Sequence, residues 1–183
     1  MELKEGMIGF SGGDMWIQKA IRLFIGSEFS HSFTTKNNDQ GVLCALETSS
    51  TTVMFGPVAD KLNEKNWVEM WDVITPEDKK QASLAKLLPY IGKWYGYLSY
   101  IWFMYRWLMR KFSYEPKKMW YWCRGGITCT EYTQKYPHDF FPELFEGLDP
   151  NTIAPAELRK IMVANPDKFV CLGWFIYFPH SIP

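Results

Sequence analysis

The chain has 183 residues, with 20 basic residues, 20 acidic residues and a formal net charge of zero. This length is typical of one domain with a substantial core, so we expect a single domain over residues 1–183. The balanced charge argues against nucleic-acid binding, because nucleic-acid-binding domains normally carry a basic surplus. The four cysteines show no Cys-x-x-Cys spacing and the three histidines lie far apart, so we expect no structural zinc site.

The N-terminus is charged rather than apolar, because residues 1–5 include two glutamates and one lysine. A secretory signal peptide needs an apolar segment after its charged start. We therefore expect no signal peptide and synthesis in the cytoplasm with reduced thiols. Export without a signal peptide, as a toxin or as part of a phage virion, is the alternative.

Hydrophobic periodicity and turn-forming residues predict strands grouped between helices. The predicted strands cover residues 7–10, 32–35, 42–46, 67–74 and 169–178. The predicted helices cover residues 14–24, 76–91 and 154–164, and a further helix begins at Cys129 and closes before Pro137. This order favours an α+β fold, in which helices pack on an antiparallel sheet.

The second and third predicted strands form a hairpin that brings a histidine and a glutamate together. Residues 37–41 are polar and end in glycine, which is typical of a hairpin loop of five residues. With that loop Phe33 pairs with Ala45, and His31 pairs with Glu47. Residues directly opposite each other in an antiparallel pair have Cβ atoms about 4.5–5.5 Å apart. Glu47 would then accept the N–H of the His31 ring.

Cys129 is the candidate nucleophile, because its sequence context predicts a helix start. Thr128 and Glu131 match a capping box, which places Cys129 in the first turn. A helix N-terminus stabilises an anion by about 0.3–1 kcal/mol, and a neighbouring imidazole takes the thiol proton. We therefore predict Cys129 as nucleophile, His31 as base and Glu47 as the group that orients His31. The backbone N–H of Cys129 is the predicted oxyanion donor.

Other cysteines and histidines are interpreted as having no catalytic role. They are the structural cysteines Cys44, Cys123 and Cys171 and the surface histidines His138 and His180. A free cysteine in an apolar context is typically a small buried hydrophobe. For Cys129 the alternative is likewise a small buried hydrophobe with no catalytic role. For Glu47 the alternative is a solvent-exposed charge on a strand.

Several short stretches occur in an order that a known family shares. They are residues 4–10, 14–24 and 30–32, Glu47, and residues 82–95, 129–131 and 154–158. Together they resemble the permuted NlpC-type branch of the papain-like superfamily, the YiiX-like group, which is related to lecithin retinol acyltransferase. Met7 stands where this family usually has Asp, and Thr130 stands where it has Ser.

The resemblance implies a circularly permuted papain-like fold, with His31 and Glu47 before Cys129 in the chain. It implies a thiol hydrolase with no metal or organic cofactor, whose leading substrates are peptide amides of the bacterial cell wall. The second option is a hydrolase or acyltransferase acting on an acyl ester or amide of a lipid. A third option is a non-catalytic structural part, such as a phage or secretion-system component that retains the fold.

An aromatic run over residues 94–109 is the most unusual feature of the composition, since 17% of the chain is aromatic. Between Lys93 and Arg106 only 12 uncharged residues occur, whereas a membrane-spanning helix needs about 20. A buried helix face is one interpretation. The alternatives are a hydrophobic substrate wall, a membrane-surface patch or a protein interface, with Trp102 and Trp107 among the exposed rings. The oligomeric state stays open.

Overall fold

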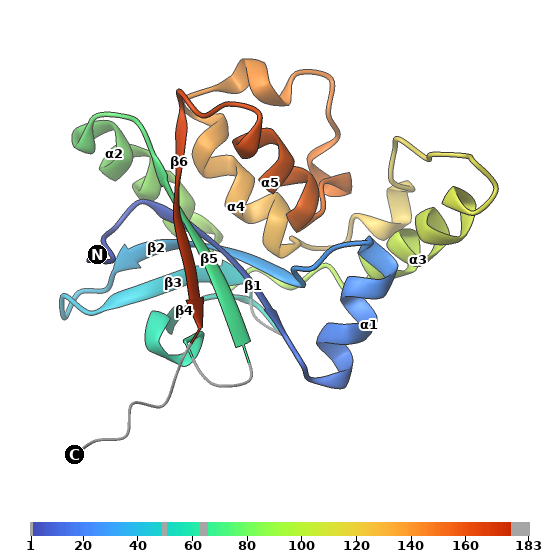
Figure 1. The fold of residues 1–183 in the computed structure, drawn as a ribbon, viewed down its shortest axis with the longest axis horizontal. Helices are drawn as coiled ribbons and strands as arrows, with labels where there is room; N and C mark the ends of the chain where they lie inside the picture. Colours follow the sequence, from blue (N-terminus) through green and yellow to red (C-terminus); the bar gives the residue numbers. More distant parts are fainter. Residues whose placement is uncertain (1, 49–50, 63–65, 177–183) are drawn as a thin grey trace.

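A computed structural model of the chain describes residues 2–48, 51–62 and 66–176 (Figure 1). Within these ranges the strands are β1 (Met7–Gly13), β2 (His31–Asn37), β3 (Leu43–Thr48), β4 (Val53–Pro57), β5 (Asn66–Val73) and β6 (Phe169–Ile176). The α-helices are α1 (Trp16–Ile25), α2 (Glu77–Leu87), α3 (Leu98–Arg110), α4 (Cys129–His138) and α5 (Pro155–Val163). Short 3-10 helices are η1 (Val58–Asp60), η2 (Leu88–Tyr90), η3 (Tyr121–Cys123), η4 (Pro142–Phe145) and η5 (Pro150–Thr152).

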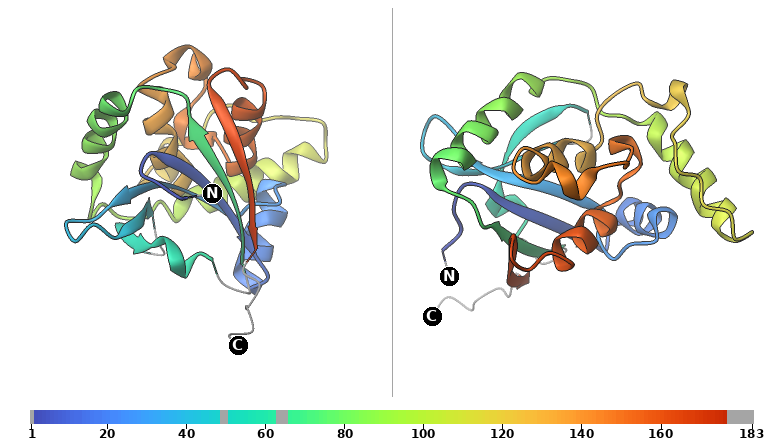
Figure 2. Two further views of the ribbon diagram at one scale, coloured as in Figure 1. Left: turned by 60° about the vertical axis from the view of Figure 1, so that its left-hand side comes forward. Right: turned by 90° about the horizontal axis from the view of Figure 1, so that it is seen from above.

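The strands form one six-stranded sheet in the order β4-β3-β2-β1-β5-β6, and all neighbouring pairs are antiparallel. Helices α4 and α5 lie over one face of this sheet, whereas α1 and α3 lie together at one end (Figure 1). Seen from above, α3 projects beyond the rest of the molecule (Figure 2). The predicted α+β class, with helices packed on an antiparallel sheet, is confirmed.

Alternation along the strands gives the sheet two apolar faces, because successive side chains point to opposite sides. In β1, Ile8 belongs to the large core cluster that includes Tyr132 of α4 and Leu158 of α5. The adjacent Met7 belongs to a smaller cluster that includes Val58 of η1. Helices therefore cover one face, while η1 covers part of the other.

Two helices end at residues other than the predicted ones, and in both cases a proline lies near the end. Helix α2 stops at Leu87 rather than residue 91, because Pro89 lacks the N–H that the next helical turn would need. Helix α4 does not close before Pro137 but continues to His138. The N–H of Asp139 still donates to the Lys135 carbonyl at 3.3 Å, so the proline is accommodated in the last turn.

Strand β4 was not expected from the sequence, because Gly56 and Pro57 interrupt its short pattern. The predicted strand at residues 67–74 lies one residue earlier, as β5. The predicted last strand is β6, and its expected end at Phe178 lies outside the described residues. A bulge lies between β5 and β6, since Met70 pairs with Gly173 and Trp71 with Cys171.

The hairpin register differs from the predicted one by two residues. The loop has the expected five residues but covers 38–42 instead of 37–41, because the Asn38 side chain organises the turn. Its Oδ1 accepts the N–H groups of Gln40 and Val42, both at 3.0 Å. Thr35 therefore pairs with Ala45 rather than with Leu43.

Direct opposition of His31 and Glu47 is consequently wrong. Each strand, however, has a side-chain period of two, so a shift of two residues leaves every side chain on its predicted face. His31 and Glu47 still share a face of neighbouring strands and meet diagonally. Their side chains are long enough to interact from these positions, as described below.

Candidate active site

Cys129 is the first residue of α4, as the capping box predicts. The Thr128 hydroxyl accepts the N–H of Glu131 at 3.2 Å, and the Glu131 carboxylate accepts the N–H of Thr128 at 3.4 Å. This reciprocal cap fixes where the helix starts. Cys129 is only 6% exposed, at the positive end of the helix. The Ser32 backbone of β2 lies near enough to the thiol to help lower its pKa.

His31 joins this thiol to a carboxylate. It is the first residue of β2; its ring hydrogen bonds to Glu47 and lies near enough to Cys129 for the two charges to shift each other's pKa. The contact with the Glu47 Oε2 atom is made by Nε2. An imidazole has two ring nitrogens, so Nδ1 is the one left for the sulfur of Cys129. The structure thus brings together all three residues that the sequence singles out.

Lys61 is a fourth polar residue at this site, and sequence reasoning missed it. Its Nζ atom lies 2.6 Å from Oε1 of Glu47, while Oε2 of the same carboxylate faces His31. Glu47 is almost completely buried, so these two cationic partners satisfy both of its oxygens. Lys61 directly follows η1, and its contact with β3 is purely tertiary. No spacing or motif in the sequence indicates it.

The electrostatics favour a thiolate facing an imidazolium. Burial works to lower the pKa of His31, but the negative charges of Glu47 and Cys129 outweigh it and raise that pKa from 6.5 to about 9. Burial works to raise the pKa of the Cys129 thiol, but the His31 charge outweighs it and lowers that pKa. Burial is likewise outweighed at Glu47, where His31 and Lys61 hold the carboxyl pKa below its usual value.

Two cavities meet at the candidate triad. An open cleft of about 330 Å³ lies on the side of His31 and Glu47, with polar lining from Gln18, Lys61 and Asn66. A narrow cavity of about 20 Å³, with room for one small group, lies at Cys129 itself. Its lining is mostly apolar, with residues Ile21 and Ile25 of α1, Phe103 of α3, Ile153, Ala154 and Pro155 among its walls.

Tyrosines from the aromatic run form a wall shared by both cavities. Tyr95 and Tyr100 line the cleft and the narrow cavity, and their hydroxyl groups are 2.5 Å apart. Burial, together with the negative charge of Cys129, raises the pKa of both phenols. They therefore stay protonated at neutral pH and can donate hydrogen bonds at the thiol.

A close backbone approach positions this tyrosine wall. Tyr95 and Ile127 form a parallel bridge, in which the Ile127 N–H donates to the Trp94 carbonyl at 3.1 Å. A Cβ atom on Gly126 would lie 2.8 Å from that carbonyl oxygen, so only glycine fits there. The segment that leads into Cys129 is thus held directly beside the start of the aromatic run.

The other sulfur and imidazole groups lie apart from this site. Cys44 and Cys123 are buried, as expected, and burial raises the pKa of Cys123. The expectation for Cys171 is wrong, because β6 is an edge strand and leaves its thiol exposed. His138 is exposed, and His180 lies outside the described residues. Among the described residues, no group of three His, Cys, Asp or Glu side chains could hold a metal ion.

Comparison with known proteins shows similarity to a solved structure. No family model and no curated protein matches the chain. The fold is similar to the crystal structure of the metalloprotein YiiX from Escherichia coli O157:H7, with a TM-score of 0.54 and 19% sequence identity. The match covers 92% of this chain and 88% of the YiiX chain. At this identity the similarity concerns the fold, which is of the YiiX type.

Proposed function

We propose that the chain is a cysteine hydrolase of the permuted papain-like type. One observation carries the proposal: a thiol at a helix N-terminus lies beside an imidazole whose charge lowers its pKa, and this imidazole is hydrogen-bonded to a buried carboxylate. Cys129 is the nucleophile, His31 the general base and then acid, and Glu47 the group that orients His31. The chain order, histidine and glutamate before cysteine, supports the permuted assignment.

In the proposed reaction the Cys129 thiolate attacks the carbonyl carbon of an amide or ester. The carbonyl oxygen becomes an oxyanion, which accepts a hydrogen bond from the N–H of Cys129, a helix-start amide with no intrahelical acceptor. The His31 imidazolium then gives its proton to the leaving amine or alcohol as the C–N or C–O bond breaks. Water, deprotonated by His31, hydrolyses the resulting thioester and frees the thiol.

Lys61 acts in this scheme as a positioning residue. It occupies the Glu47 oxygen that His31 does not use, and so keeps the carboxylate ionised and fixed in orientation. A fixed Glu47 holds the His31 ring with Nδ1 toward the sulfur. Lys61 touches neither the thiol nor, in this proposal, the reacting carbonyl.

Peptide amides of the bacterial cell wall are the first proposed substrate class, in line with the family resemblance. The polar lining of the open cleft supports it, because Gln18 and Asn66 can bind peptide groups on the leaving side. Lipid acyl esters or amides are the second candidate. The apolar walls of the narrow cavity at Cys129 support that candidate, since they suit the methylene group next to the reacting carbonyl of an acyl chain.

Thiol labelling tests the proposal without a known substrate. In a Cys171→Ser background, which removes the exposed thiol, iodoacetamide should alkylate Cys129 far faster than Cys44 at neutral pH. His31→Ala should abolish that difference. A protein that retains the fold as a structural part would leave Cys129 no more reactive than Cys44. Hydrolysis of a peptide-amide panel and an acyl-ester panel then separates the two substrate classes.

A further inference from the structure

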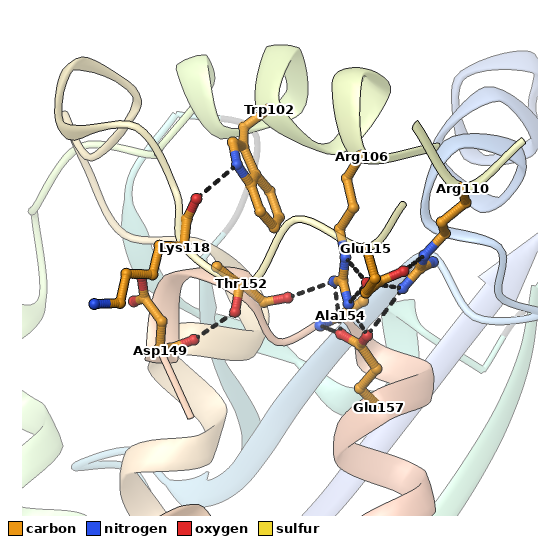
Figure 3. Close-up of polar contacts among 9 residues, drawn as sticks. All are labelled: Trp102, Arg106, Arg110, Glu115, Lys118, Asp149, Thr152, Ala154 and Glu157. Atoms are coloured by element: carbon orange, nitrogen blue, oxygen red, sulfur yellow. Dashed lines mark hydrogen bonds and ion pairs between the residues drawn. The ribbon is translucent and has the colours of Figure 1, made fainter. Parts of the chain in front are cut away.

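Helix α3 carries its charged residues on the inside. Arg106 and Arg110 point from α3 toward α5, where both contact Glu157, at 2.5 and 3.2 Å (Figure 3). Arg106 also donates to the Thr152 carbonyl at 2.9 Å, and both arginines pair with Glu115. The cations of this helix are therefore used to attach it to the body of the protein.

The opposite side of α3 is apolar and has no cover. Leu98, Ile101, Met104 and Leu108 recur at intervals of three or four residues, and each is 44–46% exposed. We call the α3 outer face the surface formed by these four residues together with Trp94, Tyr97 and Phe112, which are 52–73% exposed. Helix α3 already buries Trp102 and Phe103 in the core, so this second apolar stripe has no cover and indicates an external apolar partner.

The exposed surface differs in composition from the one expected from the sequence. Trp102 is fully buried, and its indole N–H donates to the Lys118 carbonyl at 3.2 Å (Figure 3). Trp107 is partly buried against Phe24. The rings of Trp102 and Trp107 thus hold α3 in place, and aliphatic side chains dominate the outer face instead.

The segment that follows α3 is basic, although the whole chain is neutral. Residues 111–118 contain three Lys residues and a single acidic residue, Glu115, which is already paired with Arg106 and Arg110. Lys111, Lys117 and Lys118 follow the C-terminal part of α3 and are exposed. None of these three lysines has an acidic partner among the described residues. An exposed apolar helix face followed by a segment with three exposed lysines suits an anionic lipid surface.

We propose that the α3 outer face docks on a lipid bilayer with anionic headgroups. The apolar side chains enter the headgroup–acyl boundary while Lys111, Lys117 and Lys118 meet lipid phosphates. None of the helices in the described ranges is long and apolar enough to cross a membrane, so α3 lies along the surface. A second copy of the chain fits less well, because a two-fold contact would place the basic surface against itself.

The docked surface reaches the candidate active site. Tyr97 belongs to the α3 outer face and also lines the open cleft beside His31. Binding to a bilayer would therefore place the cleft entrance near the headgroup region. The docking proposal concerns binding only and does not depend on turnover at Cys129.

Vesicle sedimentation tests the proposal. The purified chain is mixed with vesicles of phosphatidylcholine alone or of phosphatidylcholine and phosphatidylserine in equal amounts. We expect binding at least about tenfold stronger to the anionic vesicles, since each basic residue near such a surface adds attraction. Ile101→Gln with Leu108→Gln should weaken that binding at least about tenfold. Lys111→Glu with Lys117→Glu should weaken binding to the anionic vesicles alone.

Ile74→Gln with Val163→Gln is the matched control, because both side chains are about half exposed but lie outside α3. This control should bind like the wild type, and Cys129→Ala should too, which separates docking from the proposed hydrolysis. The proposal is overturned if the wild type ignores anionic vesicles, binds neutral vesicles equally well, or binds unchanged after the α3 substitutions. A dimer that these substitutions dissociate, without vesicle binding, would assign the face to a second copy instead.

Discussion

Replacing Glu47 by Gln removes the charge that governs the protonation of His31 while keeping the shape of the side chain. In the wild type the pKa of His31 is raised from 6.5 to about 9, against the effect of burial. This gap corresponds to about 3.4 kcal/mol, since one pKa unit equals 1.36 kcal/mol. The attractions of Glu47 and Cys129 together exceed this net figure, because they also offset the burial of the ring.

In the Glu47→Gln variant, burial is no longer offset by the carboxylate, so we expect the pKa of His31 to fall by at least about one unit. The thiolate–imidazolium pair should become scarcer at neutral pH. We expect kcat/KM for an accepted substrate to fall between about tenfold and about 300-fold. The basic limb of the activity profile, which reports loss of the His31 proton, should move to lower pH.

NMR titration of the histidine side chains measures the effect directly and needs no substrate. The His31 signal should shift its midpoint between the wild type and Glu47→Gln, while the exposed His138 provides the internal reference. A His31 midpoint that stays near 9 in the variant would refute the reasoning, because Glu47 would then not be the source of the raised pKa.

The same pair makes folding stability pH-dependent. Because the folded-state pKa of His31 is raised, its stabilisation is complete below pH 6.5 and is lost as the pH rises through about 9. Urea unfolding of the wild type at both ends of this range should show that loss, and Glu47→Gln should show a smaller one. Equal losses of unfolding free energy in the two proteins would contradict the assignment of the raised His31 pKa to Glu47.

Three further substitutions test other parts of the structure. Cys129→Ser should abolish hydrolysis yet shift the thermal midpoint little, because a helix start tolerates a hydroxyl; retained turnover would move the chemistry elsewhere. Lys61→Met should cost about 1.5–3 kcal/mol in urea unfolding at neutral pH. Since the pKa of its carboxylate partner is lowered, that cost should shrink as the pH falls below 4.5, and a pH-independent cost would contradict the pairing. Arg159→Met removes the cation that donates to the fully buried Glu69 at 2.8 and 3.0 Å and leaves this carboxylate only neutral donors, Trp71 and Cys171. It should cost about 3–5 kcal/mol, and a change below about 1 kcal/mol would show the pair to be dispensable.

The parts of the candidate site that depend on local sequence could be predicted. The Thr128–Glu131 cap involves residues three apart, so the position of Cys129 at a helix start follows from the sequence alone. The hairpin loop length was also predictable, which fixes the face of His31 and Glu47. Which asparagine closes the turn was not, because Asn38 and its neighbour Asn37 are equally suited to a turn by residue type.

Long-range contacts explain what the sequence does not reveal. Lys61 pairs with Glu47 only because η1 folds back beneath β3, and the orientation of α3 depends on Glu157, 51 residues from Arg106 along the chain. Hydrophobic periodicity locates the apolar stripe of α3 but assigns it to the core by default. Helix α3 has two apolar stripes, and the one that contains Trp102 and Phe103 faces the core. Glu157 holds the arginines on that same side, which leaves the second stripe outside. Which side of α3 faces the protein can be told only when these tertiary partners are known.

The irregular pairing of β6 has a consequence for how this protein behaves at high concentration. Strands at the rim of a sheet present unpaired backbone groups that can recruit another molecule, and this rim also exposes Val170 and Trp174. Gly173, at a φ of 110°, breaks the regular spacing of those groups midway along the strand. An incoming chain could match only one half of β6 at a time, so the bulge discourages the open-ended strand addition that leads to fibrils.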